Sequence, residues 1–267
     1  MKRLAFAVAL LIGLNTASQA DYRDGVAAYL RGDYATALHE LKPLAEQGNS
    51  DARFILGFMY ANGHGITRDY AEAAKWYRKA AERGHAVAQA NLGVMYDKGR
   101  GVPQDHAEAL KWTRKAAAQG DAVAQFNLGV MYYDGQGVRP DYAEAVKWFR
   151  KAAERRDANA QFNLGLMYDR GQGVPRHYGE AVKWYHQAAE QGHPVAQNSL
   201  GVMYEEGQGV SRDYVQAHMW YTLAASRHPP GKDRDLAARN REVVAAEMTP
   251  AQIAEAQRLA REWQPKK

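Results

Sequence analysis

Leu92-Gly93-Val94-Met95-Tyr96 is one of five copies of the same phrase, and the even spacing of these copies decides the fold. Their glycines are Gly57, Gly93, Gly129, Gly165 and Gly201, a constant step of 36 residues. A tryptophan column keeps the same step, at Trp76, Trp112, Trp148, Trp184 and Trp220. A period of this length is typical of a solenoid, in which each unit buries its apolar face only against its neighbours.

Residues 85–120 show what one unit contains. Apolar residues at 88, 92, 95 and 96 have helical spacing, and Gly99 and Gly101 then interrupt the pattern. A second helix begins at Asp105, passes through Trp112 and ends at Gly120. We therefore predict a first helix (helix A), a glycine loop, a second helix (helix B) and a tight turn in each repeat.

The start and the end of helix B differ slightly between repeats. Asp105 and Glu108 have the spacing of a capping box, in which the aspartate accepts backbone N–H groups and the glutamate reaches back. His177 replaces the aspartate in repeat 4, where we expect a weaker cap. Arg156 stands where three other repeats have glycine after helix B, and we expect a different turn there.

The segments outside the repeats suggest a leader peptide and two caps. Lys2 and Arg3 precede an apolar run over residues 4–14, and Ser18 and Ala20 are small residues before the expected cleavage point. We thus divide the chain into a signal peptide (1–20), an N-terminal capping helical pair (21–48), five repeats (49–228) and C-terminal capping helices (229–267). No other stretch is apolar enough to predict a transmembrane segment.

Composition excludes several kinds of chemistry. The 267 residues contain no cysteine, so disulfides, thiol catalysis and thiolate metal sites are absent. Without Lys2 and Arg3 the chain has 33 basic and 30 acidic residues, a net charge of +3. A balance this even does not indicate nucleic-acid binding.

The conserved phrase resembles a known repeat. The pattern A-x-x-x-LG-x-MY-x-x-G-x-GV-x-x-DYAEA-x-KWYRKAAE-x-G, which covers residues 49–228 and partly 21–48, is similar to the Sel1-like repeat, a relative of the tetratricopeptide repeat. The resemblance implies an all-α fold, a right-handed α/α superhelical solenoid of helical hairpins. It also implies a protein–protein interaction role, which in exported bacterial members concerns envelope signalling, envelope assembly or host contact.

We find no constellation that predicts catalysis, a cofactor or a metal. The Gly-x-Gly loops lack a following Gly-Lys-Ser/Thr and leave a helix rather than a strand, so they read as helix ends. None of the nine histidines forms His-Glu-x-x-His. Some exported relatives are linked to β-lactam hydrolysis, but those carry a cysteine pair in each repeat, so a β-lactamase-like hydrolase is the least favoured reading.

A second face of helix A varies between repeats and is our candidate binding surface. We call positions 51, 54, 58, 61 and 62 and their equivalents in the other repeats the helix-A stripe, and by analogy with tetratricopeptide solenoids it lines a concave groove. A variable, partly aromatic surface indicates a binding site. The alternative is that Phe126 and Phe162 pack on neighbouring helices. The candidate partner-binding residues are Phe54, Phe58, Asp97, Phe126, Tyr133, Asp134, Phe162, Asp169 and Glu205.

These observations favour a non-enzymatic adaptor. We expect a monomer in the periplasm or secreted from the cell, with its signal peptide removed after Ala20, that holds a protein or peptide in its groove. The alternative ligand is a cell-wall (peptidoglycan) fragment, because aromatic side chains stack on sugars.

Overall fold

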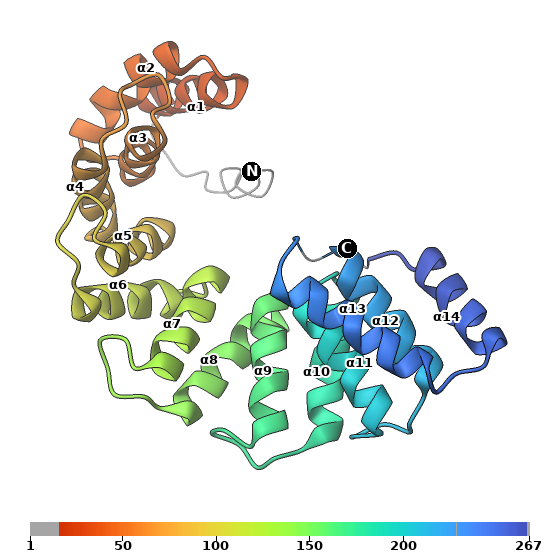
Figure 1. Cartoon of the computed structure of the whole chain (residues 1–267). Coiled ribbons are helices and arrows are strands. Elements are labelled where there is room, and N and C mark those ends of the chain that lie inside the picture. The colour runs from red at the N-terminus through yellow and green to blue at the C-terminus, as the bar shows by residue number, and fades with distance from the viewer. Residues whose placement is uncertain (1–15, 228, 266–267) are drawn as a thin grey trace. The chain divides into compact units, whose positions relative to one another are not determined.

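The computed structural model describes residues 16–227 and 229–265, which form fourteen α-helices and no strands (Figure 1). The predicted leader run lies outside these residues, and the expected cleavage point after Ala20 falls inside the first helix. The bounds are α1 Thr16–Arg31, α2 Tyr34–Glu46, α3 Ser50–Asn62, α4 Tyr70–Ala81, α5 Ala86–Lys98, α6 His106–Ala118, α7 Ala122–Asp134, α8 Tyr142–Glu154, α9 Ala158–Arg170, α10 Tyr178–Glu190, α11 Pro194–Glu206, α12 Tyr214–Arg227, α13 Lys232–Ala245 and α14 Pro250–Glu262.

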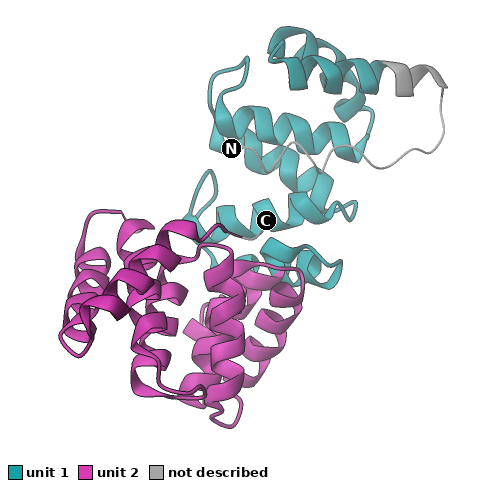
Figure 2. Cartoon of the chain, turned by 90° about the vertical axis from the view of Figure 1, so that its right-hand side faces the viewer, with its two compact units in different colours: residues 1–124 teal, residues 125–267 magenta. Residues whose placement is uncertain are grey.

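The helices follow one another in pairs, as the period predicts. Pairs α3–α4 to α11–α12 supply helix A and helix B of repeats 1 to 5, α1–α2 precede them, and α13–α14 follow. The chain divides into two compact units, residues 1–124 and 125–267, and α7 begins in the first and continues in the second (Figure 2). Consecutive helices pack on each other from α1 to α6 in the first unit and from α8 to α13 in the second, and α14 packs on α12. This sequential packing is that of a solenoid.

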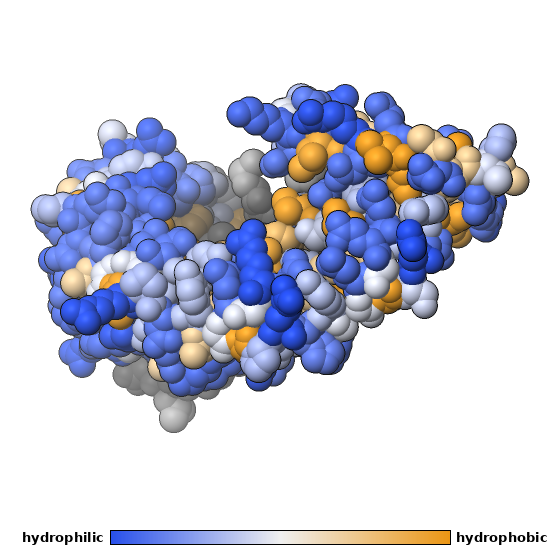
Figure 3. All heavy atoms as spheres, turned by 60° about the horizontal axis from the view of Figure 1, so that its bottom comes forward, coloured by the Kyte–Doolittle hydropathy of each residue, from blue (hydrophilic) through white to orange (hydrophobic). Residues whose placement is uncertain are grey.

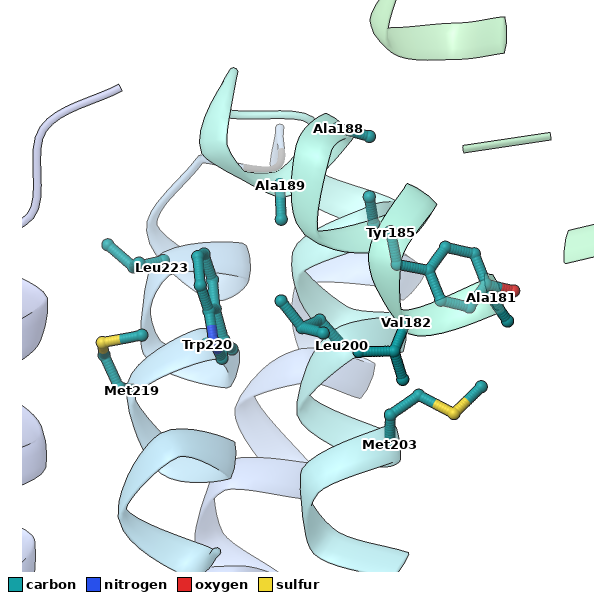
Figure 4. Close-up of a cluster of buried hydrophobic side chains, with 11 residues drawn as sticks. Ala181, Val182, Tyr185, Ala188, Ala189, Leu200, Met203, Met219, Trp220 and Leu223 are labelled. Carbon is teal, nitrogen blue, oxygen red and sulfur yellow. The ribbon is translucent and has the colours of Figure 1, made fainter. Parts of the chain in front are cut away.

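Helices A and B of one repeat meet at the glycine of the Leu-Gly phrase. A Cβ atom on Gly165 of α9 would lie 2.7 Å from Cδ1 of Tyr185, the α10 residue that follows Trp184. Tyr185 is only 1% exposed and belongs to a buried cluster with residues of α11 and α12, among them Leu200 and Trp220 (Figure 4). The same contact recurs at Gly57–Tyr77, Gly93–Thr113, Gly129–Phe149 and Gly201–Tyr221.

A second glycine joins consecutive repeats. A Cβ atom on Gly101, in the loop of repeat 2, would overlap the backbone carbonyl of Tyr70 at the start of α4 in repeat 1. Gly173 lies in the same way against Tyr142 in the second unit. The glycine loop therefore rests on the first turn of the preceding helix B, and only a residue without a side chain allows this approach.

The N-terminal caps of helix B partly match the prediction. Asp105 accepts hydrogen bonds from the backbone N–H groups of Ala107 and Glu108, whereas Nδ1 of His177 accepts from Glu180 alone, at 3.1 Å. Glu108 does not reach back to the backbone of Asp105. Its carboxylate instead accepts from Nζ of Lys111 at 2.7 Å and from Nε1 of Trp112 at 3.0 Å. The capping-box prediction is wrong for the glutamate because two donors on its own helix compete for it.

The turn at Arg156 does not differ from the glycine turns, so that prediction is also wrong. Arg156 has φ +65°, the left-handed region that Gly120 occupies in the equivalent turn. Its backbone N–H donates to Ala153 O at 2.9 Å, just as that of Gly120 donates to Ala117 O at 3.0 Å. The same hydrogen bonds fix both turns, and Arg156 adopts the backbone conformation that they require.

Replacing Arg156 by glycine should stabilise the protein. A non-glycine residue in the left-handed region costs about 1–2 kcal/mol, of which the greater freedom of glycine in the unfolded chain cancels a part. We expect Arg156→Gly to raise the free energy of unfolding, measured in urea, by about 1 kcal/mol. Arg155→Gln, at the neighbouring residue with φ −88°, should leave it within about 0.5 kcal/mol, and equal effects of the two substitutions would contradict the assignment of strain.

Adding a methyl group at Gly165 should have the opposite effect. Because the new Cβ would press on the Tyr185 ring, we expect Gly165→Ala to lower the free energy of unfolding by about 1–3 kcal/mol. Gly179→Ala is the matched control, since Gly179 is also helical but faces only the exposed His177 ring, 3.2 Å away. That control should gain about 0.5–1 kcal/mol, and a stable Gly165→Ala variant would refute the close contact.

Candidate partner-binding face

The aromatic members of the helix-A stripe are half-buried rather than open. Phe54, Phe58, Phe126, Tyr133 and Phe162 all belong to this class. Val94, at the same position as Phe58, is 36% exposed, and Val123 and Val195, at the position of Asp51, are 60% and 38% exposed. Figure 3 shows one face of the molecule, on which hydrophilic residues predominate and hydrophobic side chains gather in small separate groups.

Two of the phenylalanines bridge consecutive repeats. The Phe162 ring lies 5.8 Å from that of Tyr185 in its own repeat and stacks at 5.0 Å on His193, the N-cap of α11 in the next repeat. Phe54 makes the same stack at 4.7 Å with His85, the N-cap of α5. Histidine therefore stands at the tight turn after Phe54 and after Phe162, whereas Asp157 follows Phe126. Our sequence analysis did not predict these two stacks.

The other aromatic members also contact their own scaffold. The ring of Phe126 lies 5.9 Å from that of Phe149, and the Tyr133 hydroxyl donates to Oε1 of Gln172 at 3.3 Å. Phe58 meets the His64 ring edge-on at 5.9 Å. These side chains therefore pack on the scaffold, as the alternative interpretation of the stripe predicts, and each keeps part of its surface exposed.

The N-terminal helical pair packs around His64 of the repeat 1 loop. The Tyr34 ring stacks on His64 at 4.7 Å, and the Tyr29 hydroxyl lies 2.9 Å from its Nδ1. Tyr29 also meets Phe58 edge-on at 6.3 Å. The first pair therefore covers part of the stripe in repeat 1.

Two acidic members of the stripe serve the scaffold. Asp169 accepts a hydrogen bond from the Tyr185 hydroxyl at 3.2 Å, and Glu205 accepts one from Tyr221 at 2.5 Å. Burial, together with these carboxylates, raises the pKa of both tyrosines above its ordinary value, so they donate throughout the physiological range. The hydroxyl is the only polar group of each buried tyrosine side chain, and these carboxylates accept its hydrogen bond.

The remaining acidic members are Asp51, Asp97, Asp134 and Glu206. Asp51 lies 3.3 Å from Nε2 of His85, and Asp97 lies 2.8 Å from Nζ of Lys98 and 3.1 Å from Nδ1 of His106. Asp134 and Glu206 are exposed at the ends of α7 and α11. Val94 and Asp134 are thus accessible to a partner, as are other exposed members of the stripe such as Lys98 and Arg170.

A buried glutamine column, which the sequence analysis did not identify, links repeats. Nε2 of Gln89 donates to Ala81 O at 2.9 Å, at the end of the preceding helix B, and Gln161 donates in the same way to Ala153 O at 3.1 Å. The signal in the sequence is the Ala-Gln pair four residues before each Leu-Gly, except in repeat 1, where Arg53 replaces the glutamine. Each bond adds a second donor to a carbonyl at the helix end, which also accepts from a backbone N–H of the turn.

The tryptophan column is buried to different degrees. Trp76, Trp112 and Trp220 are at most 9% exposed, whereas Trp148 is half-buried. Nε1 of Trp148 donates to Glu144 at 3.2 Å, and Nζ of Lys151 lies 4.3 Å from the ring centroid. The following residue, Phe149, is 1% exposed and forms the core contact with Gly129. The core aromatic of this repeat is therefore the residue after the tryptophan.

Within residues 16–227 and 229–265 there is no group of three or more acidic or histidine side chains arranged to hold a metal ion. No helix in this part of the chain combines the length and apolar character needed to cross a bilayer.

All five repeats match the model of a known repeat family. The Sel1 repeat model matches residues 50–85, 86–121, 122–157, 158–193 and 194–228. The chain belongs to the Sel1 repeat family. Proteins with this repeat generally mediate protein–protein interactions, and the solenoid is typically a scaffold without catalytic activity.

One solved structure supports the same family, and a second is reported beside it. A Sel1 repeat protein from Oxalobacter formigenes is 32% identical, with a TM-score of 0.77 and coverage of 92% of this chain and 99% of that one. The protective antigen c5321 of uropathogenic Escherichia coli, which displays an SLR fold, is 30% identical over 92% of this chain and 68% of that one, with a TM-score of 0.44. No curated protein matches the chain.

Truncation of adjacent aromatic residues should separate the core from the outer face. We expect Phe149→Ala to lower the free energy of unfolding by about 3–5 kcal/mol, because it empties a buried site. Trp148→Ala should cost less, about 1–3 kcal/mol, because half-buried rings remove less area from water. Urea unfolding of both variants measures the difference, and a larger loss for Trp148 would reverse this assignment.

Proposed function

We propose that this Sel1 repeat protein is an exported adaptor that holds another protein or a peptide against its helix-A stripe. The leader-like residues 1–20 support export to the periplasm or beyond, and the family supports a protein partner. The role would concern signalling, assembly or host contact at the cell envelope.

The observation that carries the proposal is the difference between the two sets of repeated positions. The Leu-Gly glycine recurs in every repeat, because scaffold contacts have to be the same in each unit. The stripe changes from Phe58 to Val94 at one position, and from Ala61 to Asp97 at another. Variation within a fixed scaffold supports a surface selected for something outside the repeat.

Accessible stripe residues define the contact most directly. Val94 provides an apolar surface in the first unit, and Asp134 provides an exposed carboxylate in the second. Each unit offers its own section of the stripe, so each is tested separately. An extended or helical segment with apolar and basic side chains matches this surface chemically.

Site-specific crosslinking tests the proposal. A photoreactive amino acid at Val94 or Asp134, in the protein expressed in its native envelope, should yield the same protein adduct on irradiation. The matched control is Lys111, an exposed residue of α6, which is helix B of repeat 2. It should yield no such adduct.

A charge substitution completes the design. Val94→Glu places a like charge near Asp97 at an exposed site. It should reduce the adduct formed from a photoreactive residue at the exposed stripe position Lys98, while leaving urea stability within about 0.5 kcal/mol. Adducts from Lys111 but not from the stripe, or adducts with glycan alone, would contradict a protein partner on this face.

A further inference from the structure

A polar pocket in the second unit lies apart from the helix-A stripe positions. It lies where the turn between α8 and α9 meets the end of α10, and it has a volume of about 150 Å³. Its lining contains no apolar side chain and consists of Arg156, Gln161, Gln187, Glu190 and Gln191. The pocket therefore presents one cation, one anion and three amides to a ligand.

Hydrogen bonds within the lining fix its amides in place. Nε2 of Gln191 donates to Oε1 of Gln161 at 2.7 Å. Nε2 of Gln161, which is 3% exposed, donates to Ala153 O at 3.1 Å and to Oε1 of Gln187 at 3.3 Å. Since the Gln187 oxygen is engaged, its Nε2 is the group left to donate to a ligand.

The charged groups of the pocket differ in their surroundings. Among the described residues, no side chain pairs with the guanidinium of Arg156, which is exposed. The carboxylate of Glu190 lies 3.5 Å from Nδ1 of His186 on the same helix. An unpaired guanidinium beside fixed amides is suited to a planar anion, because it presents N–H donors in a fork that matches a carboxylate.

Comparison between repeats shows that this arrangement is particular to the junction of repeats 3 and 4. The Arg156 position is glycine at 48, 84, 120 and 192, and the Gln187 position is lysine at 79, 115 and 151. Those lysines lie 4.3–4.5 Å from the tryptophan centroid of their own repeat. Repeat 4 lacks this lysine and keeps only Lys183, 5.7 Å from the Trp184 centroid, while the turn before it carries Arg156.

The cation at the turn has a conformational cost. Arg156 is the only non-glycine residue with positive φ in the described parts of the chain. Strain of this kind persists where function requires it, and glycine would occupy the position without strain. The one strained residue of the described chain is thus also the residue that brings a positive charge to the pocket.

We propose that this pocket binds an α-carboxylate group together with the N–H group next to it. Arg156 holds the carboxylate through paired N–H donors, and Nε2 of Gln187 donates to it as well. Glu190 accepts from the adjacent nitrogen, which is an ammonium in a free amino acid and an amide N–H at a peptide C-terminus. These two sources share the recognised chemistry, and both fit the capture of chain ends by fixed polar groups.

Binding is measured by NMR titration of the full chain, with the side-chain amide signals of the pocket glutamines as the readout. The probes are L-alanine, alanyl-alanine and alanyl-alanine amide. We expect saturable shifts with at least one of the first two below about 10 mM and none with the amide, which lacks the carboxylate. Equal affinity for L-alanine indicates a free amino acid, whereas preference for the dipeptide indicates a peptide C-terminus.

Arg156→Gly separates binding from folding. It should weaken binding by about tenfold or more while raising the stability of the protein, a combination that loss of structure cannot produce. Gln187→Leu, which removes the amide donor from a side chain of similar size, should also weaken binding. Arg155→Gln removes the same charge from the neighbouring residue outside the lining and should change nothing.

Three results would overturn the proposal. They are the absence of saturable shifts with both carboxylate probes, equal binding of the amide probe, and unchanged binding by Arg156→Gly. None of these results depends on crosslinking from Val94 or Asp134, so the experiments test the pocket and the adaptor function independently.

Discussion

The glycine of each Leu-Gly phrase lies against the residue that follows the tryptophan, and the packing of both helices in a repeat depends on this contact. At Gly165 the ring of Tyr185 occupies the space that a Cβ would need. Helix axes approach closely at such a point, and large side chains elsewhere fill the remaining volume. Because the contact is the same in each unit, an identical phrase recurs along the chain.

Consecutive repeats are joined by contacts of three kinds. The loop glycine, such as Gly101, rests on the start of the preceding helix B, and the buried glutamine, such as Gln89, donates to a carbonyl at its end. The third contact is the stack of a stripe phenylalanine on a histidine N-cap, as in Phe162 and His193. Backbone approach and amide hydrogen bonds fix the register of neighbours more narrowly than apolar burial alone, which is not directional.

The helix-A stripe combines packing with exposure. Asp169 and Glu205 accept hydrogen bonds from buried tyrosines, so part of the variation along the stripe reflects the identity of the helix B residue behind it. Val94 and Asp134 accept no hydrogen bond from a buried tyrosine, and both are exposed to solvent. This distinction narrows the adaptor surface to fewer positions than the variable columns suggest. The same comparison between repeats points to Arg156, where a strained residue replaces glycine.

The sequence by itself determined the repeat, the helical pairs, the glycine ends of helix A and the family, because each follows from local spacing and residue type repeated at one period. It did not determine which aromatic residue of helix B in repeat 3 is the more deeply buried, since Trp148 and Phe149 are adjacent and apolar alike. Nor did it show that Glu108 bonds Trp112, or that Arg156 takes the turn of a glycine. Tertiary structure decided these points, because they depend on which groups meet across helices and on how many donors compete for one acceptor.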